Sequence, residues 1–140
     1  LEGYRQALAE YGITPDKNWV ISVPFNEEGG ERAAHQLLNC GIPFTAAVTF
    51  NDVMAAGIMR ILHQQGITLP QQLSIVGFDD VVMARYLYPA LTTMHYPVER
   101  MARCASQLAI QLFKGATQRP SVNSFTAELV IRDSVLPPSL

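Results

Sequence analysis

The sequence predicts an α/β fold of three layers, in which a parallel sheet is covered by helices on both faces. Segments with apolar residues at helical spacing alternate along the chain with short apolar segments that are typical of strands. These short segments are apolar along their whole length rather than at every second position, which indicates strands buried on both faces. The connections between the parallel strands should be right-handed crossovers.

The pattern of residues 1–78 predicts three helices that alternate with three strands. Gly12, Gly41 and Gly66 follow the expected helices, as is typical where a helix ends. Asn51 or Asp52 is expected to cap the third helix, because both side chains accept hydrogen bonds from backbone N–H groups. The expected order is helix 1–11, strand 19–23, turn 26–30, helix 31–39, strand 45–50, helix 52–65 and strand 73–78.

The pattern changes after Asp80. A loop or short helix is expected before Pro89, and an extended segment is expected before Pro97. A long helix with one apolar face follows, and the chain closes with a turn-rich segment and a strand. In order, these are a loop or short helix 83–88, an extended segment 91–96, a helix 98–113 with Met101, Ala105, Leu108 and Leu112 on one face, turns 115–123 and a strand 125–131.

The composition is that of a globular protein. The 140 residues are 49% apolar and 16% charged, with a net charge of −2. No apolar run is long enough to span a bilayer, and no Lys/Arg cluster forms a basic surface for nucleic acid phosphates. Cys40 and Cys104 are far apart, so we expect buried, reduced thiols of a cytoplasmic protein, with a disulfide as the alternative. The chain opens within a helical pattern at Leu1, which predicts that it is part of a longer protein.

Aromatic and polar side chains follow three of the expected strands, at the edge where loops of a parallel sheet converge and ligands bind. Phe25 offers an aromatic ring, Asn51 a side-chain amide, and the pair Asp79 and Asp80 two carboxylates. This set suits a sugar, because sugar hydroxyls donate to carboxylates and the C–H face of a sugar packs on aromatic rings. Each residue also has a structural interpretation. Asn51 could be only a helix cap, the two carboxylates could belong to a turn or a cap, and Phe25 could be an exposed loop residue.

The sequence contains no motif for catalysis or for cofactor binding. It has no Gly-x-Ser-x-Gly elbow, no Walker loop, no Gly-x-Gly-x-x-Gly and no set of His or Cys metal ligands. Asp79 and Asp80 could form an acid–base pair or bind a metal, but neighbours at a strand end point in opposite directions. We therefore expect no enzyme, no catalytic residue, no cofactor and no metal. A metal-dependent enzyme that uses these two carboxylates is the alternative.

Four stretches of the sequence resemble the lactose/galactose-repressor family of bacterial transcription regulators. Residues 46–57 read Ala-Ala-Val-Thr-Phe-Asn-Asp-Val-Met-Ala-Ala-Gly, and residues 73–80 read Leu-Ser-Ile-Val-Gly-Phe-Asp-Asp. Pro-Ala-Leu-Thr-Thr at 89–93 and Leu-Val-Ile-Arg-Asp-Ser at 129–134 follow in the family's order. The resemblance covers the whole chain and is greatest to galactose repressors and isorepressors, although His95 stands where these typically have an arginine.

The resemblance implies a two-lobed sensor of the type I periplasmic-binding-protein-like fold, with a sugar effector in the cleft between the lobes. Residues 1–91 would form the C-terminal lobe. Residues 92–121 would be a crossover strand and a helix of the N-terminal lobe, and residues 122–140 a return strand and a tail. The rest of the N-terminal lobe, and an arginine ligand directly before Leu1, would lie outside this chain.

The resemblance also implies roles for particular residues. In the cleft, Phe25 would form an aromatic wall, and Asn51 and Asp79 would bind sugar hydroxyls. Tyr96 would be a further cleft residue. The residues expected at a homodimer interface are Ala56, Arg85, Tyr86 and Leu87.

The implied partners are a small galactose-like sugar, a second copy of the chain, and operator DNA. The DNA would be bound only through a helix-turn-helix domain at the N-terminus of the longer protein. The resemblance implies a cytoplasmic repressor that does not bind a membrane. The alternative with the same fold is a periplasmic sugar-binding protein of an ABC transporter. For the interface residues, the alternative is ordinary surface for Arg85 and core for Leu87.

Overall fold

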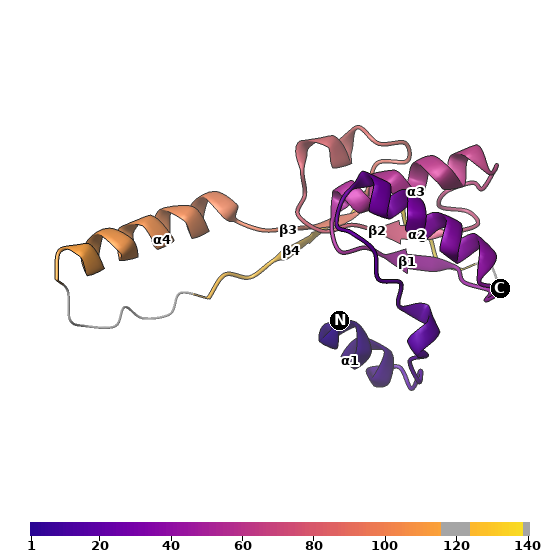
Figure 1. Ribbon diagram of the computed structural model, residues 1–140, viewed down its shortest axis with the longest axis horizontal. Helices are drawn as coiled ribbons and strands as arrows, with labels where there is room; N and C mark the ends of the chain where they lie inside the picture. The colour runs from indigo at the N-terminus through magenta and orange to yellow at the C-terminus, as the bar shows by residue number, and fades with distance from the viewer. Residues whose placement is uncertain (116–123, 139–140) are drawn as a thin grey trace.

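In the computed structural model, the chain forms an α/β body from which one long helix extends (Figure 1). The structure describes residues 1–115 and 124–138, so most of the predicted turn segment 115–123 lies outside the described residues. The elements are α1 (Glu2–Glu10), the 3-10 helix η1 (Lys17–Trp19), α2 (Glu27–Asn39), β1 (Ala46–Val48), α3 (Asp52–Gln64), β2 (Ser74–Val76), the 3-10 helix η2 (Val82–Arg85), β3 (Thr93–His95), α4 (Val98–Phe113) and β4 (Glu128–Val130). The predicted order is confirmed, apart from the strand expected at residues 19–23.

The strands form a parallel pair and an antiparallel pair that meet at the end of β2. β1 pairs with β2 in parallel, as predicted, and β3 pairs with β4 antiparallel. Two isolated parallel bridges connect the pairs, one from Val76 to Thr92 and one from Asp79 to His95. The residues that follow β2 therefore run alongside the segment that leads into β3.

α2 and α3 pack on one face of β1 and β2 and enclose the hydrophobic core (Figure 1). The two helices approach closely because glycines face the partner helix. A Cβ atom at Gly30 would overlap the carbonyl oxygen of Met54, and a Cβ atom at Gly57 would overlap that of Glu27. The predicted apolar face of α3 is buried, which confirms its helical spacing: Met54, Ile58, Ile61 and Leu62.

α2 begins at Glu27, earlier than the sequence suggested. The side-chain oxygen of Asn26 accepts a hydrogen bond of 2.9 Å from the backbone N–H of Gly29, which caps the helix. Gly29 and Gly30 had indicated a turn, but both are buried in the first turns of α2. The lack of a side chain at Gly30 permits the close approach to α3, whereas at Gly29 it leaves room for the carbonyl oxygen of Pro24.

The other face of the sheet is open in the part of the chain that the structure describes. Val48 of β1 is 67% exposed, so the predicted burial on both faces is wrong there. The predicted strand at 19–23 is replaced by η1 and an extended segment outside any strand ladder, although Ile21 and Val23 pack against the core. α1 lies on the opposite side of β1 from α2 and α3 (Figure 1), and none of its side chains is buried. Because α1 does not pack, two layers rather than three are in contact here.

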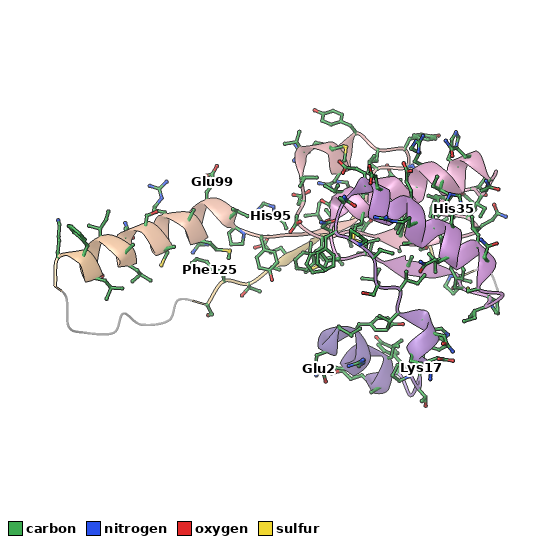
Figure 2. All side chains as sticks on the ribbon, viewed as in Figure 1. Glu2, Lys17, His35, His95, Glu99 and Phe125 are labelled. Atoms are coloured by element: carbon green, nitrogen blue, oxygen red, sulfur yellow. The ribbon has the colours of Figure 1, made fainter. Side chains whose placement is uncertain are left out.

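α4 has the predicted bounds, but it projects from the body at the end of β3 (Figures 1 and 2). None of its side chains is buried, and Leu112 on its apolar face is 58% exposed. The predicted burial of the two cysteines is also wrong. Cys40 is exposed at the end of α2, and Cys104 is only half-buried because α4 does not pack on the body.

Candidate functional site

Asn51 connects the start of α3 to the loop that contains Phe25. Its Oδ1 accepts a hydrogen bond of 2.8 Å from the backbone N–H of Met54, so the helix-cap interpretation is confirmed. Its Nδ2 donates a hydrogen bond of 3.3 Å to the backbone carbonyl of Phe25. An amide NH2 group has two hydrogens, so one N–H of Asn51 is left over for a ligand.

Phe25 forms a stacked aromatic pair with Phe50. The ring centroids lie 4.2 Å apart, and the ring planes are inclined by 21°. Phe25 is 64% exposed and Phe50 is 63% exposed, so the pair presents apolar surface to solvent. Phe50 was not among the predicted site residues, although its place between β1 and Asn51 could have indicated it. Such a platform suits the C–H face of a sugar ring.

A second aromatic contact lies at the end of β2. The rings of Phe78 and Tyr96 are 5.1 Å apart and tilted by 53°. The carbonyl oxygen of Phe78 accepts a hydrogen bond of 2.9 Å from the backbone N–H of Asp52 at the start of α3. Tyr96, just after β3, is thereby connected through Phe78 to the residue next to Asn51.

Asp79 is exposed and sits in an unusual backbone conformation. Its φ is 107° and that of Asp80 is 54°, in a region of φ that L-residues rarely adopt. The backbone N–H of Asp79 donates a hydrogen bond of 2.9 Å to the carbonyl of Met94. Burial, and then the charge of Asp52, raises the pKa of Asp79 above its ordinary value. Among the described residues, no side chain hydrogen-bonds to its carboxylate, so both oxygens can accept from a ligand.

Asp80 differs from Asp79, because its carboxylate is bound within the protein. Arg132 donates a hydrogen bond of 2.5 Å to Oδ1, and Nδ1 of His95 lies 3.1 Å from Oδ2. Burial acts to raise the pKa of Asp80, but the hydrogen bonds and charges of Arg132 and His95 lower it below its ordinary value. The two adjacent carboxylates therefore do not form a shared site. In the described ranges, no group of three or more His, Cys, Asp or Glu residues could hold a metal ion.

Asp52 is a fully buried carboxylate beneath the site, and the sequence indicated it only as an alternative helix cap. Its Oδ1 accepts a hydrogen bond of 2.5 Å from the hydroxyl of Thr93, and its Oδ2 accepts one of 2.9 Å from the backbone N–H of Val81. Asp52 therefore fixes the start of α3, the loop after β2 and the start of β3 relative to one another. No local pattern could have indicated these partners, since they are distant in sequence.

The predicted cleft residues thus lie along one connected series of contacts. Asn51 holds the Phe25 loop, the backbone of Asp52 binds Phe78, and Phe78 contacts Tyr96. Asp79 directly follows Phe78 and bridges to the strand that precedes Tyr96. This edge offers apolar rings, one amide donor and one available carboxylate, which are groups that can bind a polyhydroxylated ligand.

The residues predicted for a dimer interface lie on α3 and around η2. Tyr86 is 77% exposed and Arg85 is exposed, whereas Leu87 packs partly against the core. Ala56 is half-buried on α3. Leu87 is therefore at least partly a core residue, which was the alternative interpretation for it.

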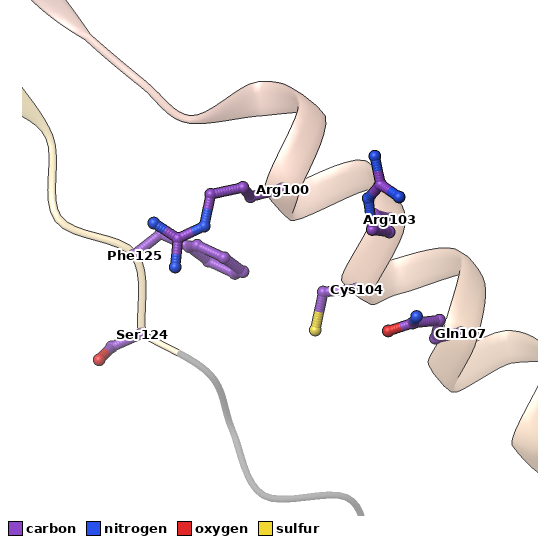
Figure 3. Close-up of a pocket in the computed structure, with 6 residues that line it drawn as sticks. All are labelled: Arg100, Arg103, Cys104, Gln107, Ser124 and Phe125. Carbon is purple, nitrogen blue, oxygen red and sulfur yellow. The ribbon is translucent and has the colours of Figure 1, made fainter.

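A hollow of about 320 Å³ lies elsewhere, between the first turns of α4 and the return segment (Figure 3). It is open to solvent, and Asp79 is not among the residues that line it. Its lining residues are Arg100, Arg103, Cys104, Gln107, Ser124 and Phe125. Within residues 1–115 and 124–138, no helix combines the length and apolar character needed to cross a membrane.

Comparisons with known proteins agree with the fold and with the motifs. The family described as "Periplasmic binding protein-like domain" matches residues 1–135. The HTH-type transcriptional regulator GalR of Escherichia coli strain K12 is 44% identical over 140 residues, which are 100% of this chain and 41% of that protein. A sugar-binding transcriptional regulator of the LacI family from Escherichia coli, solved with phosphate, matches with a TM-score of 0.87 at 34% identity, over 97% of this chain and 49% of that chain. The complex of the transcriptional regulator CelR with cellobiose matches with a TM-score of 0.90 at 28% identity, over 96% of this chain and 41% of that chain.

The chain spans less than half the length of each of these relatives. All three are transcriptional regulators rather than enzymes, and the match extends over nearly the whole of this chain. The chain therefore belongs to the periplasmic-binding-protein-like domain family, with the sequence and fold of a sugar-binding domain of LacI/GalR-type transcriptional regulators.

Proposed function

We propose that this chain supplies the C-terminal lobe, with one crossover strand and one helix of the N-terminal lobe, of the effector-sensing domain of a cytoplasmic transcriptional repressor, and that its effector is a galactose-like sugar. The observation that supports this most is the connected series of contacts from Phe25 through Asn51 to Phe78, Asp79 and Tyr96. The 44% identity to GalR supports the choice of sugar.

Each group in this series has a chemical part in the proposal. The carboxylate of Asp79 accepts hydrogen bonds from two sugar hydroxyls, and the remaining N–H of Asn51 donates to a hydroxyl oxygen. The stacked rings of Phe25 and Phe50 pack against the C–H face of the sugar. Tyr96 closes the site on the side of the crossover strands. The opposite wall of the cleft comes from a lobe outside this chain.

We propose a division of the chain that agrees with that arrangement. Residues 1–91 belong to the C-terminal lobe, residues 92–121 are a crossover strand and a helix of the N-terminal lobe, and residues 122–140 return to the C-terminal lobe. The exposed apolar face of α4 supports this, because such a face is stable only when another part of the protein covers it. We expect α1 to complete the third layer of this lobe.

The regulatory mechanism requires a dimer and a DNA-binding head. Two copies associate through surfaces that include Ala56, Arg85, Tyr86 and Leu87, for which the exposure of Tyr86 is support. Their lobes set the separation of two helix-turn-helix heads on the operator half-sites. The lobes exist in two arrangements in equilibrium. The sugar shifts this equilibrium by the difference between its affinities for the two arrangements.

The decisive experiment uses the full-length regulator and fluorescence anisotropy on labelled operator DNA. D-Galactose should release the wild type from the DNA. Asp79→Ala should abolish that release while it leaves DNA binding without sugar unchanged, because only the ligand contact is lost. Asp133→Ala, which removes an exposed carboxylate after β4, is the matched control and should respond like the wild type. Normal release of the Asp79→Ala protein would show that the site assignment is wrong. Sugar binding by a protein with no DNA response would favour a periplasmic transport protein instead.

A further inference from the structure

Asp80, Arg132 and His95 form a cluster of side chains next to Asp79, which precedes Asp80 in the sequence and forms a backbone bridge with His95. We call these three residues the Asp80 cluster. Asp80 follows β2, His95 ends β3, and Arg132 follows β4. The cluster therefore joins the loop after β2 to both of the strands that lead towards α4 (Figure 1).

Arg132 is the most constrained member of the cluster. Its side chain is 14% exposed and that of Asp80 is 10% exposed, so their ion pair is largely shielded from water. Arg132 also donates a hydrogen bond of 2.8 Å from its guanidinium to the carbonyl of Leu91, and one of 2.9 Å from its backbone N–H to the hydroxyl of Thr92. A planar guanidinium can hold a carboxylate and a carbonyl at the same time, whereas an ammonium group has no such fixed geometry.

The backbone between these contacts is in a conformation that has to be held. Asp79 and Asp80 both have positive φ, and neither residue is glycine. Such conformations persist only where the surrounding structure determines them, and they are concentrated at functional sites. The backbone of the loop is fixed by hydrogen bonds from the N–H of Asp79 to Met94 and from the N–H of Val81 to Asp52. The side chain of Asp80 adds the only described link from this loop to Arg132.

We propose that Asp80, Arg132 and His95 are positioning residues, which hold the Asp79 carboxylate in the orientation that binds the sugar and couple it to the arrangement of β3 and β4. This proposal rests on the proposed function, because Asp79 must be the residue that touches the sugar. Arg132 has the larger part, since its pair with Asp80 is shielded. His95 is 49% exposed and orients the second oxygen of Asp80. A shift of β3 relative to β4 would pull on Asp80 and turn Asp79, so the position of the two strands and the affinity for sugar are linked.

The test measures the dissociation constant of D-galactose by calorimetry on the full-length regulator, well below the unfolding temperature of each variant. Asp80→Asn and Arg132→Gln should each weaken binding about ten-fold, and the double variant should be no weaker than either single variant, because the two residues act as one unit. Arg132→Lys should recover part of the affinity that Arg132→Gln loses, because it keeps the charge. Arg32→Gln, at an exposed arginine of α2, is the matched control and should bind like the wild type.

Two outcomes would overturn the proposal: binding by Arg132→Gln within two-fold of the wild type, or losses that simply add in the double variant. A second measurement separates this result from a failure of the proposed function. Asp80→Asn should speed amide hydrogen exchange in residues 78–82 without any sugar, since the loop loses its link to Arg132. If the wild type does not bind D-galactose, the sugar assignment fails, and unchanged exchange in that loop would separately refute the positioning role.

Discussion

The hydroxyl of Thr93 donates a hydrogen bond of 2.5 Å to the carboxylate of Asp52, and both residues are fully buried. This contact joins the first residue of α3 to the first residue of β3, which are 41 positions apart in the sequence. A buried carboxylate is tolerated only where hydrogen bonds replace those it made with water. The contact therefore stabilises the junction between the proposed lobe and the strands that leave it.

Thr93→Val should destabilise the folded chain by about 1–3 kcal/mol, because it preserves the shape of the side chain but leaves one oxygen of Asp52 without its donor. The free energy of unfolding, measured by urea denaturation, would report the loss. Thr126→Val changes an exposed threonine before β4 and serves as the control, with an expected change below about 0.5 kcal/mol. Equal stabilities for the two variants would contradict the assigned role of the Thr93 hydroxyl.

Gly77→Ala should also destabilise the chain, because there is no room for a methyl group at this position. A Cβ atom at Gly77 would overlap Oδ1 of Asp52 and would lie 2.8 Å from Cδ2 of Leu91. Overpacking of this kind costs about 1–3 kcal/mol. Gly3→Ala is the matched control, since nothing lies within 4 Å of that position on α1 and alanine favours a helix. A thermal scan should show a lower Tm for Gly77→Ala and an unchanged or higher one for Gly3→Ala.

Asp80 should stabilise the folded chain at neutral pH and lose that effect in acid. Its pKa is lowered because Arg132, and then His95, outweigh the burial that would raise it. The folded chain therefore binds the proton less readily than the unfolded chain. The stabilisation is fully present above the ordinary pKa of 3.8, and it is lost as the pH falls through the lower folded value. Asp80→Asn should reduce the urea midpoint at neutral pH, and this effect should shrink as the pH falls below 3.8 and through the lower folded value.

Asp79→Asn provides a control with the opposite sign. Burial and the charge of Asp52 raise the pKa of Asp79, so the folded chain binds this proton more readily than the unfolded chain. The protonated carboxyl group contributes to the stability of the folded chain below pH 3.8, and this contribution is lost as the pH rises through the pKa of the folded chain. Because Asp79 is exposed and water screens its charge, replacing it should raise the urea midpoint at neutral pH only slightly, as is common for ionisable groups kept for binding. The same direction of change for both variants would refute the assignment of distinct roles.

Phe50→Ala should weaken sugar binding with little effect on stability. The Phe50 ring is 63% exposed and stacks on Phe25, so it contributes to a ligand surface more than to the core. Loss of one aromatic partner costs about 0.5–1.5 kcal/mol, which corresponds to roughly a two- to ten-fold weaker affinity for D-galactose. Calorimetry on the full-length regulator measures the affinity, and Phe50→Tyr should retain it. Unchanged affinity of Phe50→Ala would remove Phe50 from the site.

The sequence by itself determined the elements whose causes are local. Pro97 and the apolar spacing that follows predicted α4 with its observed bounds, and the predicted cap at Asn51 or Asp52 is provided by Asn51. The parallel pairing of β1 with β2 also followed from the alternation of elements. The helix and its cap depend on residues that are close in sequence, where propensity, capping and periodicity act, whereas the pairing of β1 with β2 follows from the order of the elements along the chain.

The tertiary structure alone decided which partners distant residues find. An apolar run such as residues 19–23 predicts a strand, yet in the structure this segment joins no ladder. Asp79 and Asp80 are neighbours of the same type, but one is available to a ligand and the other is bound by Arg132, 52 positions away. The stack of Phe50 on Phe25 and the bond from Thr93 to Asp52 arise in the same way. Sequence patterns record the side chains at an edge of the sheet, whereas their pairing depends on how folding brings remote segments into contact.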